Sequence, residues 1–232
     1  MSLNIVRHLV TAPVDRDSIA LGACYAIDHA QTLLEDAAAL YSHKCASGAF
    51  HLAVMAREEL GRFNLLADRY HKLSAGEFLD AEELAQSLQP HKVKLLAGQS
   101  TVPVPMTTEQ LAEWSAAIRR NDEQTISAIS KDVRLRAQKL KPHQAAELHQ
   151  RRLKAQYVDL DPQTGRWSQP SSVSMLDAST LIRTVVAEIS NALIGSQGVA
   201  WIHSGFQVAG MSPPQMGPFT HRIYGHLGAG DA

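Results

Sequence analysis

The sequence predicts an all-α protein, folded as an antiparallel bundle of helices. Apolar residues recur every three or four positions in several long segments, which is the spacing of a buried helix face. Glycines and prolines separate these segments. Short β-like pieces are expected only between residues 157 and 170. We therefore expect one helical domain over residues 17–205, preceded by an arm at 1–16 and followed by a Gly/Pro-rich, flexible or draped tail at 206–232.

The composition is that of a soluble globular protein. At 232 residues, the chain can bury a core without disulfides. Its 22 basic and 23 acidic residues nearly balance, so any RNA contact needs a local basic patch. Cys24 and Cys45 lie in helical patterns without metal-ligand spacing, as expected in a reducing compartment. Neither a signal sequence nor a long apolar run occurs, so we expect a cytoplasmic protein with no membrane contact.

The first long helix is expected over residues 17–43. Asp17 or Ser18 offers an N-cap, and the apolar stripe begins at Ile19. Gly48 is expected to mark the join to a second long helix. The two helices should therefore pair as an antiparallel hairpin.

The second helix carries two acids inside its apolar pattern. Glu59 falls in a row with Leu52 and Leu66, so it is expected to turn toward whatever the helix packs on. Glu58 is expected to lie further round and to pair with Arg62 one turn later. A carboxylate beside an apolar face needs a cation or hydrogen-bond donors. Glu59 and Arg62 therefore belong either to a polar site between helices or to the solvated rim of the core.

Two short helical segments follow, at residues 80–89 and 91–96, with a proline between them. His91 and Lys94 share one face of the second segment. They either donate to an acidic pair on another helix or face solvent on a surface turn. Residues 98–107 contain Val-Pro-Val-Pro and are expected to be extended or looped.

The middle of the chain is predicted to be helical. Thr107 and Gln110 have the spacing of a capping box, which starts a helix. Asn121 either begins a further helix or only distorts this one. Leu140, in the segment that follows, is expected to face inward. Residues 134–152 form the chain's clear basic concentration, a pattern that usually indicates a solvated face.

Near the C-terminus, the turn sequence Asp-Pro-Gln-Thr-Gly within residues 157–170 predicts a small hairpin or tight loop. Ser174 or Asp177 is expected to cap a last long helix. Apolar residues cover more than one of its faces, so it should touch at least two other helices. From Gly205 onward, prolines and glycines leave little room for regular structure.

Several acids and histidines invite a metal interpretation, namely Asp28, His29, Glu35 and Asp36 on the first helix. A di-iron bundle, however, needs paired Glu-x-x-His motifs on separate helices, and the sequence contains none. Asp68-Arg-Tyr-His71 is the nearest substitute. We therefore expect no metal site and no cofactor.

Three motifs, in order, resemble those of the AbiV-type abortive infection proteins, a family of the HEPN superfamily. Ala56-Arg-Glu-Glu-Leu-Gly-Arg62 resembles the A-x-E-E-x-G-[KR] signature of that family. His91-Lys-Val-Lys94 resembles its His-x-x-Lys segment. The family's Tyr-Val-Asp turn is similar to Lys154-Ala-Gln-Tyr-Val-Asp159, which is followed by Gly165, Trp167 and Pro170.

The resemblance covers roughly residues 17–205. It implies a HEPN-like helical bundle, a homodimer, and a bacterial protein that halts the phage-infected cell by acting on or through RNA. A phage protein or an antitoxin is a further partner that the resemblance implies.

Many HEPN ribonucleases carry an arginine followed by a histidine after four to six residues. Arg136 and His143 fit this spacing. The cation would stabilise the scissile phosphate, and the imidazole would move the proton of the attacking 2′-hydroxyl. Pro142 is expected to disturb a helix just before the histidine. Arg222 and His226 have a shorter gap and lie in the tail.

The sequence leaves three classes of function open. The first is the RNA-cleaving defence protein described above. The second is a non-enzymatic interaction module, and the third is a bundle enzyme that binds a metal or small molecule. In the second class, a polar cluster would fix helix register or a dimer interface. Its members would be Glu58, Glu59, Arg62, His91 and Lys94.

Overall fold

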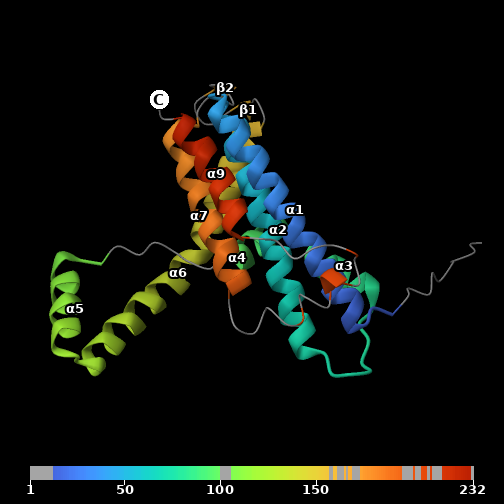
Figure 1. The fold of residues 1–232 in the computed structure, drawn as a ribbon, viewed down its shortest axis with the longest axis horizontal. Helices are drawn as coiled ribbons and strands as arrows, with labels where there is room; N and C mark the ends of the chain where they lie inside the picture. The colour runs from blue at the N-terminus through green and yellow to red at the C-terminus, as the bar shows by residue number, and fades with distance from the viewer. Residues whose placement is uncertain are drawn as a thin grey trace, which may run out of the picture.

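The computed structural model confirms the all-α architecture (Figure 1). It describes residues 13–99, 106–156, 159–160, 165, 167–168, 173–194, 201, 205–207, 210 and 216–230. Helices α1 and α2 form the centre of the bundle, and α7 packs on both of them while α9 packs along α1. The elements of the described residues are α1 Arg16–Ser42, α2 Ala46–Lys72, α3 Ala81–Leu88, α4 His91–Gly98, α5 Thr108–Arg120, α6 Glu123–Gln156, β1 Asp159–Leu160, β2 Trp167–Ser168, α7 Met175–Ile194 and α9 Met216–Gly230.

Helices α1 and α2 form the expected antiparallel hairpin. The start of α1 and the turn between the two helices both differ from the prediction. Asp15 caps α1, because its side chain accepts a hydrogen bond from the Ser18 backbone N–H at 2.8 Å. The turn between the helices lies earlier than Gly48, at a residue with positive φ, Lys44 (φ 62°). Gly48 is inside α2, where its missing side chain leaves room for the Leu40 methyl group. Alanines dominate the packed surface, so the two helices approach closely.

Helix α7 is the central helix that its apolar pattern predicts. It contacts both α1 and α2, and its residues Ile182, Val185 and Ile189 are fully buried. Ser174 and Asp177 cap its start reciprocally, since each side chain accepts a hydrogen bond from the other residue's backbone N–H.

The C-terminal tail contains a helix that the sequence analysis did not expect. Helix α9 packs along α1 and contacts α7 (Figure 1). Its apolar residues Phe219, Ile223 and Leu227 repeat every four positions and are buried. Pro218 lies in the first turn, where a missing backbone N–H costs no helical hydrogen bond. Gly225, between Ile223 and Leu227, weakens the helix locally, but burial of its apolar stripe offsets that cost.

Helix α6 runs unbroken through Pro142, which was expected to disturb it. Its C-terminal half lies against α2 and α4, whereas its N-terminal half projects away from the bundle and carries α5 (Figure 1). The predicted capping box of α5 is present at Thr107 and Gln110. The sequence predicts that Leu140 faces inward. The residue is instead 39% exposed, because no other described helix covers this part of α6.

The predicted hairpin is present as the antiparallel pair β1 and β2, with Asp159 opposite Ser168. The β-like piece expected at residues 157–158 lies outside the described residues, as do residues 1–12 and 100–105. Among the described helices, none is both long and apolar enough to span a membrane.

Candidate functional site

The candidate site depends on a close crossing of α2 and α4 at two glycines. A side chain at Gly61 would place its Cβ 1.8 Å from the backbone oxygen of Lys94. One at Gly98 would lie 2.3 Å from the backbone oxygen of Arg57. Asn64 fixes the crossing by donating a hydrogen bond from Nδ2 to the Ala97 carbonyl at 2.9 Å. The glycine of the A-x-E-E-x-G-[KR] motif therefore allows α4 to lie directly on α2.

This crossing brings His91, the first residue of α4, onto a buried acid of α2. The Glu58 side chain is only 5% exposed, and its Oε2 lies 2.7 Å from His91 Nδ1. An ionised carboxylate only accepts hydrogen bonds, so the hydrogen lies on Nδ1 of His91. The other carboxylate oxygen, Oε1, lies 3.5 Å from Nη1 of Arg152 on α6. Glu58 is thus held between an imidazole and a guanidinium from two other helices.

A second imidazole completes the cluster. His149 on α6 stacks on His91, with ring centroids 5.8 Å apart and ring planes 21° from parallel. Desolvation lowers the pKa of His149, as do the positive charges of Arg152 and His91, while Glu58 opposes them. His149 is therefore favoured as a neutral imidazole at pH 7. We call Glu58, His91, His149 and Arg152 the Glu58 centre.

His51 lies near this centre, two turns before Glu58 on α2. Desolvation lowers its pKa, the charge of Arg152 lowers it further, and Glu58 raises it. Both histidine pKa shifts have burial as their largest cause. The Glu58 centre is therefore a partly dehydrated site rather than a patch of surface charges.

The residue before Glu58 forms a different ion pair. Arg57 pairs through Nη2 with Oε1 of Glu188 on α7, and their side chains are 8% and 0% exposed. Sequence reasoning missed this pair. The sequence does contain a signal for the Glu188 carboxylate, because Glu188 interrupts the apolar pattern of α7 as Glu59 interrupts that of α2. The pair ties α2 to α7 on a face adjacent to the Glu58 centre.

The structure does not bring the five predicted cluster residues together in one site. Glu59 lies with Arg62 in a groove between α1, α2 and α3, and its side chain is 15% exposed. The two form an ion pair, with Arg62 Nε 3.3 Å from Glu59 Oε2, in place of the expected pair between Glu58 and Arg62. Glu58 lies further round α2 and is buried too, because α2 has neighbouring helices on several sides. Lys94 is buried in α4 and forms no ion pair with another described residue.

The predicted catalytic residues lie on α6, away from the Glu58 centre. Arg136 contacts Asp132 Oδ2 at 3.1 Å and donates to Gln110 Oε1 at 2.8 Å. His143 is exposed on the following turns. The helix rises about 1.5 Å per residue, which separates Arg136 from Arg152 by roughly 24 Å.

The remaining acids and histidines are dispersed. Arg222 of α9 pairs with Glu35 of α1. Asp68 pairs with Lys72 on α2 at 2.7 Å. In the part of the chain that the structure describes, no group of three or more His, Cys, Asp or Glu side chains is arranged to hold a metal ion.

The Glu58 centre can perform proton transfer. It contains two imidazoles from different helices, and a carboxylate fixes the orientation of one of them. Imidazoles can take up and release protons near neutral pH. His91 is 49% exposed, so its ring can meet a ligand from solvent, whereas Glu58, which also contacts Arg152, holds it from behind.

Comparison with known families gives one match. The family model for AbiV proteins of the HEPN class matches residues 19–191, which include most of α1, all of α2 and α4, and most of α7. Searches with the chain found no match among curated proteins or solved structures. Because the family match covers well over half of the chain and contains every residue of the Glu58 centre, the protein belongs to the AbiV family of HEPN proteins.

Proposed function

We propose that this protein defends bacteria against phage by abortive infection, and that it acts by cleaving RNA at the Glu58 centre. Membership of the AbiV family supports the defence role. The observation that carries the cleavage proposal is the pair of imidazoles, His91 and His149, with Glu58 bound to Nδ1 of the first. It is the arrangement in the described residues best suited to acid–base chemistry.

The proposed reaction needs one base and one acid. His149 takes the proton of a ribose 2′-hydroxyl, and the 2′-oxygen attacks the adjacent phosphorus. The bond from phosphorus to the 5′-oxygen breaks as His91 donates a proton to that oxygen. The products are a 2′,3′-cyclic phosphate and a 5′-hydroxyl. The lowered pKa of His149 suits the base, and the Glu58 carboxylate faces the cationic form of the acid.

Substrate binding at this centre would depend on Lys92. This residue is exposed beside His91, and its charge is close enough to affect the pKa of His149. A flexible ammonium group at the mouth of the centre suits the phosphate backbone of RNA. Arg152 is nearly buried, so we assign it the role of holding Glu58.

The test is RNA cleavage by the purified protein, measured in EDTA with a panel of structured and single-stranded RNAs. We expect His91→Ala and His149→Ala each to lower the cleavage rate by about 10²–10⁴-fold. His221→Ala is the matched control, because His221 is an exposed histidine of α9. Wild-type protein that leaves every RNA intact would contradict the proposal.

The Arg136 and His143 pair remains the competing catalytic proposal. It predicts the opposite ranking in the same assay, with activity lost in His143→Ala and retained in His91→Ala. We expect instead that His143→Ala keeps at least half of the wild-type rate.

A non-enzymatic interaction module is the second candidate function. The near-complete burial of Arg57, Glu58 and Glu188 favours it, since such residues also fix how helices pack. It predicts that Glu58→Gln lowers the melting temperature and phage protection together. Lost protection at an unchanged melting temperature would favour the catalytic proposal.

We also propose that the protein is a cytoplasmic homodimer. The support is the projecting arm formed by α5 and the N-terminal half of α6, on which several large apolar residues are exposed. They are Leu111, Ile118, Leu135 and Leu140. Light scattering after gel filtration should show twice the chain mass for wild type, and a smaller mass for Leu135→Gln. A wild-type monomer at all concentrations would contradict this proposal.

A further inference from the structure

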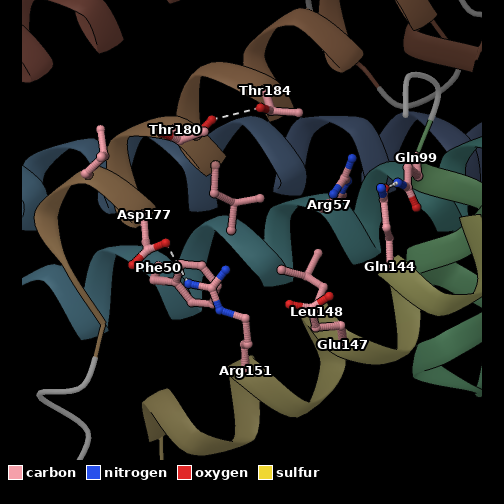
Figure 2. Close-up of a pocket in the computed structure, with 12 residues that line it drawn as sticks. Phe50, Arg57, Gln99, Gln144, Glu147, Leu148, Arg151, Asp177, Thr180 and Thr184 are labelled. Atoms are coloured by element: carbon pink, nitrogen blue, oxygen red, sulfur yellow. Dashed lines mark hydrogen bonds and ion pairs between the residues drawn. The ribbon is translucent and has the colours of Figure 1, made fainter. Parts of the chain in front are cut away.

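A pocket of about 440 Å³ lies between α2, α6 and α7, next to the end of α4 (Figure 2). Its volume falls in the range of small-molecule sites. Its lining residues Phe50, Arg57 and Arg151 directly precede His51, Glu58 and Arg152 in the sequence. Successive residues of a helix point about 100° apart, so the pocket and the Glu58 centre occupy neighbouring faces of α2 and α6.

Both arginines of the pocket are paired with carboxylates of the protein, and the exposed carboxylate of Glu147 also lines the pocket. Arg57 pairs with Glu188, and Arg151 Nη2 lies 2.7 Å from Asp177 Oδ1 (Figure 2). The hydrogen bond from Ser174, followed by that from Arg151, lowers the pKa of Asp177, which therefore stays ionised at neutral pH. An anionic ligand would have to compete with these carboxylates. The pocket is better matched to an uncharged molecule.

One end of the pocket offers amide groups. Gln99 is only 3% exposed, and its Nε2 donates a hydrogen bond to Gln144 Oε1 at 2.6 Å. Each amide has both donor and acceptor capacity beyond this single bond. The pair can therefore present a carbonyl and an N–H group side by side. That pattern complements the amide-like edge of a heterocyclic base.

The rest of the pocket offers flat and apolar surface. The Arg151 guanidinium lies 5.0 Å from the centre of the Phe50 ring (Figure 2). A planar guanidinium that stacks on one ring is suited to stack on another. Leu148 and Leu181 add apolar walls, and Leu176 at the edge of the pocket is 75% exposed.

We propose that this pocket binds an uncharged heteroaromatic molecule of the nucleobase or nucleoside class. The ring stacks on Arg151, its amide-like edge bonds to Gln99 and Gln144, and the leucines cover its remaining surface. This binding goes beyond the proposed RNA cleavage and does not depend on it, because the pocket and the Glu58 centre use different side chains.

The test is calorimetric titration of the full chain, without RNA, with adenosine, guanosine, cytidine and uridine, and with their 5′-monophosphates. We expect at least one nucleoside to bind, and to bind no more weakly than its monophosphate. Gln144→Leu should weaken that binding at least tenfold. Gln150→Leu, an exposed glutamine of α6 outside the pocket, is the matched control and should leave it unchanged.

Gln144→Glu serves as a second variant should Gln144→Leu fail to fold, and it should weaken binding to a similar degree. The proposal is overturned if none of the four nucleosides binds, if only the monophosphates bind, or if binding survives both changes at Gln144. Because RNA is absent, loss of nucleoside binding is distinguishable from absence of RNA cleavage.

Discussion

Arg57 and Glu58 are consecutive residues of α2, yet they form ion pairs of opposite character. Arg57 meets Glu188 of α7 in a pair whose side chains are 8% and 0% exposed. Glu58 meets His91 of α4, which is 49% exposed, and Arg152 behind it. The first pair is isolated from solvent, whereas the second reaches it through an imidazole.

This difference teaches how one short motif can serve both stability and chemistry. A buried pair holds two helices together, but it cannot exchange protons with a substrate. A buried acid with a half-exposed histidine keeps its geometry and still presents a titratable group to solvent. We therefore propose that the Arg57–Glu188 pair serves packing and that the Glu58 centre is the reactive one.

The largest expected effect is on the buried pair. Glu188→Ala leaves the Arg57 charge buried without its carboxylate, which should lower the free energy of unfolding by about 3–5 kcal/mol. The measurement is denaturant unfolding followed by circular dichroism. The double variant Arg57→Leu, Glu188→Leu should recover most of the loss, since no charge is then stranded. A loss below about 1 kcal/mol for Glu188→Ala would show that the pair is not structural.

The second effect concerns the crossing that positions His91. Gly61→Ala forces α4 away from α2, because the new Cβ would lie 1.8 Å from a backbone oxygen. We expect the free energy of unfolding to fall by about 1–3 kcal/mol and RNA cleavage to become slower. Gly225→Ala is the matched control, since a Cβ there meets nothing within 4 Å. That change should be neutral or stabilising, because alanine favours a helix more than glycine does.

The third effect is a pH dependence of stability. The folded-state pKa values of His51 and His149 are lowered from the ordinary value of 6.5. As pH falls through 6.5, the unfolded chain binds protons at these positions before the folded protein does, so stability should decrease. The measurement is the melting temperature between pH 8 and pH 5, values chosen to span about one and a half units on either side of 6.5. A flatter profile is expected for His149→Gln, and an identical profile would contradict this account.

The smallest expected effect is on the stability contributed by the half-exposed partner of Glu58. His91→Gln removes a half-exposed partner while Arg152 remains beside Glu58, so the free energy of unfolding should change by less than about 1 kcal/mol. Denaturant unfolding measures it alongside the RNA cleavage rate, which should fall sharply. A loss as large as that of Glu188→Ala would remove the distinction between the two pairs.

Strong local signals made much of the fold predictable. The α1–α2 hairpin, the Thr107 capping box and the broad apolar coverage of α7 all follow from residues close together in the sequence. The helix α9 was missed because its glycines and its single proline concealed an apolar repeat of only three buried residues. Local propensity is weak evidence when tertiary packing supplies the stability.

The site was harder to predict for a geometric reason. The motif located the acids on α2, but the choice between Glu58 and Glu59 depends on which helices surround α2. Glu188 is 131 residues from its partner Arg57, and no local pattern connects them. His149 and Arg152 lie in a basic segment whose sequence is typical of a solvated helix face. Only the packing of α6 on α2 and α4 brings them to Glu58.

The most direct test of the central claim is the RNA cleavage rate of Glu58→Gln, expressed per folded molecule. Circular dichroism at the assay temperature gives the folded fraction, and the wild-type protein gives the reference rate. If the Glu58 centre is reactive, the rate should fall at least a hundredfold even after correction for unfolded protein. A corrected rate equal to that of wild type would contradict the claim.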